Sequence, residues 1–96
     1  MEFTLDIETD FPDQEVNEVI HSALEHEKHV AKYKVKRYTS ICEEYEKKFG
    51  FSSGDVKTKI EARDIREESD FFNWYAAKRA LDYWNKKLII LLEILK

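Results

Sequence analysis

One short stretch decides how this chain folds: residues 49–56, which read Phe-Gly-Phe-Ser-Ser-Gly-Asp-Val. Gly50 is the residue type that most readily adopts the left-handed conformation in which helices end. Ser52 fits the N-cap of a following helix, with Asp55 three residues later in a capping-box-like role. Phe51 and Val56 flank this start as a hydrophobic staple. The stretch therefore predicts that one helix ends at residue 49 and that another begins at about 53.

The segment before this boundary has the spacing of one long helix, from about residue 12 to 49, with Pro12 in its first turn. Its apolar stripe comprises Val16, Val19, Ile20, Ala23, Leu24, Val30, Ala31, Tyr38, Ile41, Cys42, Tyr45 and Phe49. Glu27 and Lys34 also project into this stripe. This placement has three interpretations. The helix bends near residues 27–34, or the two charges lie in an interface and fix the register in which its helices pack, or the long side chains reach outward to water.

The segment after the boundary predicts a short helix at about 53–64, a charged connection, and a third helix at about 70–95 that contains both tryptophans. One stripe of the third helix comprises Trp74, Ala77, Leu81, Trp84, Leu88, Leu91, Leu92 and Leu95. Phe72, Ala76, Tyr83, Ile90 and Ile94 lie nearly opposite. This apolar arc is about twice the ~100° that a surface helix needs. The surplus predicts contact with a second protein or a second copy.

The amino terminus shows a different periodicity. Phe3, Leu5 and Ile7 alternate with polar residues, which predicts a β-strand at 2–8. No other segment alternates in this way, so pairing with the same strand of a second copy is the simplest way to satisfy its backbone. The expected fold is mainly α, as a single helical domain over 1–96: an N-terminal β-strand, one long helix, a short helix and an aromatic-rich C-terminal helix.

Composition sets limits on where the protein works. Charged residues make up 38% of the 96 residues, a Lys/Glu-rich balance typical of heat-adapted proteins. Cys42 is the only cysteine, so no intramolecular disulfide can form. The amino terminus does not have the pattern of a secretory signal, and the longest apolar run, 88–92, is too short to span a membrane. We expect a cytoplasmic protein.

No pattern in the chain predicts catalysis or a cofactor. It has no glycine-rich phosphate loop and no nucleophile elbow, and Cys42 falls in the apolar stripe, which indicates a small buried core residue. His21, Glu25 and His29 share one helix face at spacings of four and could bind Zn²⁺. Closing a tetrahedral site would need ligands from another element, so a solvated face is the better interpretation. We expect a non-enzymatic protein without a metal.

Charge is distributed unevenly along the chain. Residues 1–27 carry nine acidic side chains and no Lys or Arg, whereas 28–42 carry five basic ones and no acid. Lys28, Lys32 and Lys36 would form a ridge able to follow phosphates, with Arg37 beside it. A net charge of −4 argues against a nucleic-acid-binding protein, which we keep as the alternative function. A solvated face, or contact with an acidic partner such as the first quarter of a second copy, is favoured.

Residues 45–84 also carry a resemblance to a known family. It rests on the run at 45–53 (Tyr-Glu-Lys-Lys-Phe-Gly-Phe-Ser-Ser), on Asp-Phe-Phe-Asn-Trp at 70–74, on Ala-Ala-Lys-Arg-Ala-Leu at 76–81 and on Tyr-Trp at 83–84. In these runs the chain resembles small prokaryotic antitoxins, including the partners of TumE-like toxins. The resemblance implies a helical carboxy-terminal part that binds and neutralises a toxin.

Such antitoxins often begin with a ribbon-helix-helix module that binds operator DNA, and this chain departs from that pattern. No turn interrupts residues 13–49, and the polar face of the expected ribbon would carry Glu2, Asp6 and Glu8, which repel phosphates. The sequence therefore predicts a homodimeric protein-protein interaction protein, and the resemblance implies that a protein partner would be toxin-like. The residues expected to bind a second protein or a second copy are Phe72, Tyr75, Tyr83, Ile90 and Ile94.

Overall fold

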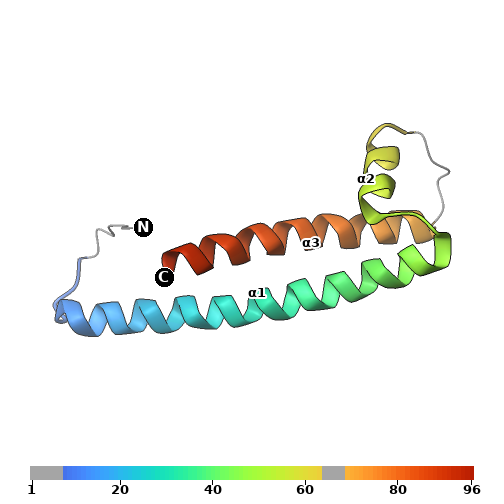
Figure 1. The fold of residues 1–96 in the computed structure, drawn as a ribbon. Helices are drawn as coiled ribbons and strands as arrows, with labels where there is room; N and C mark the ends of the chain where they lie inside the picture. The colour runs from blue at the N-terminus through green and yellow to red at the C-terminus, as the bar shows by residue number, and fades with distance from the viewer. Residues whose placement is uncertain (1–7, 64–68) are drawn as a thin grey trace.

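The computed structural model describes residues 8–63 and 69–96. They form three helices, α1 (Asp13–Phe49), α2 (Ser53–Glu61) and α3 (Ser69–Ile94), as Figure 1 shows. α1 and α3 run antiparallel side by side as a long hairpin, and α2 lies at the end where α1 finishes. The predicted helices are confirmed, with α1 and α3 within one residue of the expected bounds and α2 ending three residues earlier.

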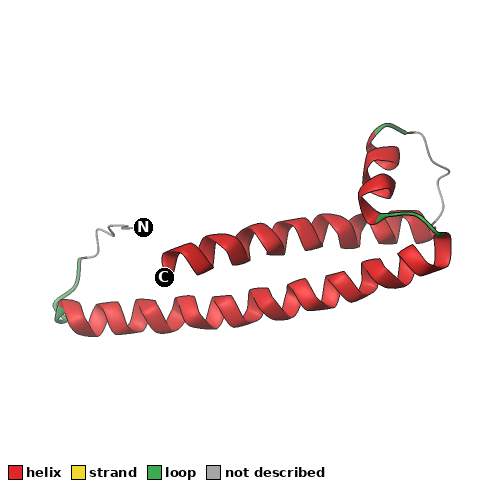
Figure 2. Ribbon diagram, viewed as in Figure 1, coloured by secondary structure: helices red, strands yellow, loops and turns green. Residues whose placement is uncertain are grey.

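The predicted strand at 2–8 falls outside the described residues apart from Glu8, which has no regular secondary structure. Figure 2 shows only helices and loops in residues 8–63 and 69–96, so the described part of the fold is all-α. None of its helices has an apolar window long enough to cross a membrane.

The corner between α1 and α2 forms by the chemistry that the sequence indicated. Gly50 has a φ of 78°, and its N–H donates to the Glu46 carbonyl at 2.8 Å. The Ser52 Oγ accepts from the Asp55 N–H at 3.1 Å, which makes Ser52 the N-cap of α2. The Glu46 carboxylate adds a contact that the sequence did not reveal, because it accepts the Ser53 N–H at 2.8 Å. A side chain of α1 therefore holds the first turn of α2.

Trp74 is the centre of the core at this corner. Its side chain is completely buried, and its Nε1 donates to the Ser53 Oγ at 2.7 Å. Around it stand aromatic rings from both sides of the corner, with centroids at 5.0 Å for Phe51, 5.7 Å for Phe49 and 5.8 Å for Tyr45. Val56 on α2 is completely buried in the same cluster. These contacts fasten all three helices to one another.

At the other end of the hairpin, α1 and α3 are the only described helices. The molecule measures 58 × 23 × 22 Å. Glu27 and Lys34 point across to α3 there. The Glu27 Oε2 pairs with the Lys87 Nζ at 2.9 Å, and the Lys34 Nζ lies 6.0 Å from the centre of the Trp84 ring. α1 remains one unbroken helix at this point. The two charges within the apolar stripe therefore serve cross-helix contacts within the chain.

Candidate functional site

The face of α3 that points away from α1 carries a row of exposed side chains. Phe72, Tyr83 and Ile90 are 47%, 59% and 47% exposed, and their spacing places them about 120–140° around the helix from the buried Ala77. Together with the small and basic residues between them they form the outer ridge of α3: Phe72, Ala76, Arg79, Tyr83, Lys86 and Ile90. At about 1.5 Å per residue the ridge is roughly 27 Å long.

Tyr83 is a well-supported anchor on the outer ridge. Its ring packs edge-on against Trp84, with centroids 5.2 Å apart and an interplanar angle of 83°. The Lys87 Nζ lies 5.0 Å from the centre of the Trp84 ring, and Lys87 pairs with Glu27. The hydrogen bond to Glu27 raises the pKa of Lys87 and keeps its charge in place. Neighbours thus hold Tyr83 while it remains exposed, which lowers the entropy lost when it binds.

Two residues of the expected binding set, Tyr75 and Ile94, are less exposed than Phe72, Tyr83 and Ile90. The Tyr75 Oη donates to the Glu61 Oε2 at 3.0 Å, and the Arg79 guanidinium lies 5.7 Å from the Tyr75 ring centre. Tyr75 therefore links α3 to the end of α2. Ile94 is half-buried in the last turn of α3. Phe72, Tyr83 and Ile90 lie in one row along α3, whereas Tyr75 also contacts Glu61 and Arg79.

A second exposed row runs along α1 and includes residues of the predicted apolar stripe. Val19 is 70% exposed and Ala23 is exposed, although both were expected in the core stripe. Tyr33 is 60% exposed on the same side. The row, here called the α1 seam, comprises Val19, Ala23, His26, Val30, Tyr33 and Arg37. Its alternating steps of four and three residues were the signal in the sequence that could have revealed it.

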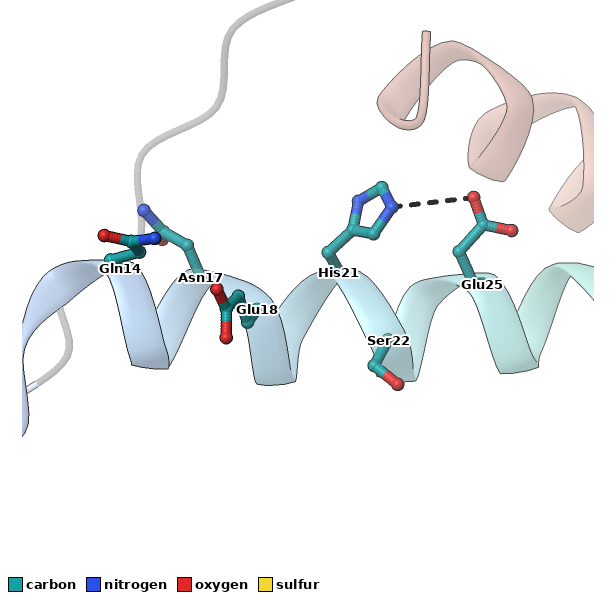
Figure 3. Close-up of a pocket in the computed structure, with 6 residues that line it drawn as sticks. All are labelled: Gln14, Asn17, Glu18, His21, Ser22 and Glu25. Carbon is teal, nitrogen blue, oxygen red and sulfur yellow. Dashed lines mark ion pairs between the residues drawn. The ribbon is translucent and has the colours of Figure 1, made fainter.

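The expected polar face of α1 is present but does not gather metal ligands. Figure 3 shows a hollow lined by Gln14, Asn17, Glu18, His21, Ser22 and Glu25, all from α1. His21 Nε2 lies 3.7 Å from Glu25 Oε1, and the Lys28 ammonium occupies the other oxygen at 2.8 Å. The hydrogen bond from Lys28 holds the pKa of Glu25 below its usual value. Within 8–63 and 69–96 no three His, Cys, Asp or Glu side chains are grouped to hold a metal ion.

The basic residues of α1 are divided between faces. Lys28 is paired with Glu25, and its side chain is only 19% exposed. Lys32 and Lys36 are exposed, whereas Arg37 lies about 100° further round the helix from Lys36 and belongs to the α1 seam. Two exposed lysines offer few positive charges, and neutralised phosphates are what give affinity for nucleic acid.

Cys42 is buried, at 3% exposure, as expected for a core residue. Burial raises the pKa of its thiol, although Ser53 offers a hydrogen bond that opposes this effect. A nucleophilic cysteine needs the opposite environment, exposed and with a lowered pKa.

Comparisons with protein-family models, with curated proteins and with solved structures find no match to this chain.

Proposed function

We propose that this chain is a non-enzymatic binding protein that uses the outer ridge of α3 to hold a second, different protein. The observation that supports this function is the exposure of Phe72, Tyr83 and Ile90 in one row on a helix whose opposite face is already buried. Large exposed apolar side chains aligned in this way are typical of interaction sites. Aromatic anchors supported by their neighbours are where binding energy concentrates in protein interfaces.

The ridge also indicates the chemistry of the partner. Arg79 and Lys86 alternate with the apolar anchors. A complementary surface is a hydrophobic groove whose rim is acidic, because like charges at the rim would slow association and favour other partners. The resemblance of residues 45–84 to small prokaryotic antitoxins makes a toxin-like protein the partner that we propose.

Co-expression with the product of the neighbouring gene tests this function. If that product is a toxin, the wild-type chain should restore growth and co-purify with it. Phe72→Glu combined with Tyr83→Glu should abolish both effects, because two charges would enter the apolar groove. Val19→Glu with Tyr33→Glu, on α1, is the matched control and should retain them. A neighbour that is harmless, or that binds the Phe72 and Tyr83 variant as tightly as the wild type, would refute the proposal.

A further inference from the structure

The α1 seam carries a second interaction surface that the outer ridge of α3 does not explain. Its residues lie about 120° around α1 from the buried Ala31, so the seam points away from α3. Val19 and Tyr33 are 70% and 60% exposed, while Ala23, His26 and Arg37 are exposed and Val30 is half-buried. Steps of four, three, four, three and four residues are the spacing with which one helix packs lengthwise against another.

We propose that the α1 seam binds the same seam of a second copy in antiparallel orientation, and so makes the protein a homodimer. In this register the small Ala23 lies opposite the large Tyr33 of the other copy. His26 lies opposite Val30, and Val19 lies opposite Arg37. Each pairing occurs twice, as a twofold axis requires. The large and small side chains therefore complement each other within one surface.

Charge decides between the two orientations. The described part of the chain before residue 28 is rich in acids, whereas 28–37 is basic. In the antiparallel pair Arg37 meets Val19 of the other copy, with Glu15 four residues away, about 6 Å along the axis. An arginine side chain can span that distance. In a parallel pair Arg37 would meet Arg37, and like charges across an interface oppose association.

The dimer leaves the outer ridge of α3 free. Because the seam faces away from α3, the second copy packs along the far side of α1. Tyr83 and Ile90 of each copy then remain available for a different protein. Self-association through the α1 seam and partner binding through the outer ridge are therefore independent, and either can fail without the other.

Sedimentation equilibrium of the purified full chain, without any partner, tests the proposal. The wild type should be dimeric at micromolar concentration. Val19→Glu with Tyr33→Glu should weaken self-association at least tenfold, with the helical circular dichroism unchanged because both side chains are exposed. Phe72→Glu with Tyr83→Glu is the control and should remain dimeric. A monomeric wild type, or a dimer that the Val19 and Tyr33 changes leave as strong as before, would overturn the proposal.

A charge exchange tests the orientation. Arg37→Glu alone and Glu15→Arg alone should each weaken the homodimer, because each places like charges together twice. Mixing the two variants should restore pairing. At one site the introduced carboxylate of one chain then meets the introduced guanidinium of the other. At the second site the original pair of Arg37 with Glu15 forms. If Arg37→Glu instead pairs best with the wild type, the helices are parallel and the antiparallel dimer is wrong.

Discussion

The two ends of the helical hairpin are built differently. At the end that carries α2, three helices enclose Trp74 and Val56, and both side chains are completely buried. At the other end α1 and α3 are the only described helices, and Phe11, Ile89 and Leu92 remain 69%, 58% and 45% exposed. The comparison indicates that stability resides mainly at the α2 end, whereas the length of the hairpin beyond it provides surfaces.

The largest expected effect is the loss of the central ring. Trp74→Ala should lower the free energy of unfolding by about 3–5 kcal/mol, because it removes a completely buried indole from the middle of an aromatic cluster. Leu91→Ala, at the open end, should cost nearer to about 2 kcal/mol, since fewer described elements surround it. Urea denaturation measures both. Equal losses at the two positions would contradict the division of stability between the ends.

The hydrogen bond between Trp74 and Ser53 should give the next largest effect. Ser53→Ala leaves the buried indole N–H without its acceptor, which should cost about 1–3 kcal/mol. The neighbouring Ser52→Ala tests the N-cap separately and should cost about 1 kcal/mol. If Trp74→Phe combined with Ser53→Ala is no less stable than Trp74→Phe alone, the cost of Ser53→Ala comes from the unsatisfied indole N–H of Trp74 and not from lost packing.

A smaller effect concerns Asp82 on α3, which pairs with Lys57 of α2 and with Lys78 of α3. Burial raises the pKa of Asp82, but hydrogen bonds from Lys78 at 2.8 Å and Lys57 at 3.1 Å outweigh it and hold the pKa below the usual value of 3.8. Asp82 therefore stabilises the fold above its unfolded pKa, and this contribution is lost as the pH falls through the lower folded value. The side chains are 23–38% exposed, so we expect at most about 1 kcal/mol.

Urea denaturation from about pH 7 to about pH 2.5 measures this contribution. Asp82→Asn should be less stable than the wild type at neutral pH, and the difference should shrink as the pH falls below the unfolded pKa of 3.8 and through the lower folded value. Glu44→Gln, at an exposed position of α1, is the control and should follow the wild type. A difference between Asp82→Asn and the wild type that stays constant over the whole range would show that the charge of Asp82 is not responsible.

The smallest effect is expected on the open end. Ile89→Ser should change the free energy of unfolding by no more than about 0.5 kcal/mol, because the side chain is 58% exposed. Differential scanning calorimetry at several protein concentrations measures it. A loss above about 1 kcal/mol would mean that Ile89 is buried in solution by a contact absent from the single chain, and the open end would then be an interface on this side as well.

Local chemistry made much of this fold predictable. Gly50 and Ser52 act where the sequence placed them, because helix termination and capping depend on residues within a few positions of each other. The burial of Cys42 and Trp74 followed from helical periodicity. The role of Ser53 did not, since its hydrogen bond joins residues 21 positions apart. Pairings between distant elements leave no trace in local spacing.

The candidate surfaces were only partly predictable for the same reason. Phe72, Tyr83 and Ile90 are exposed as expected, because they lie about 120–140° around the helix from the buried Ala77. Leu92, which the predicted stripe of Trp74 also included, is 45% exposed. The hydrogen bond of Tyr75 was not predictable, because its partner Glu61 lies on another helix. Val19 was expected in the same apolar stripe as the buried residues of α1. A long helix with two apolar rows shows one wide stripe in its sequence when only one helix is assumed to pack against it.

The two tryptophans occupy the two differently built regions, and this makes unfolding observable without a label. Trp74 is completely buried and hydrogen-bonded at the corner, whereas Trp84 on the hairpin has two lysine ammonium groups at 5.0 and 6.0 Å from its ring centre. Their fluorescence should differ in emission maximum and in quenching by iodide, an anion that the lysines attract. Single Trp→Phe variants would give one emitter at each place. Fraying of the hairpin would then be seen as a signal change at Trp84 that precedes any change at Trp74.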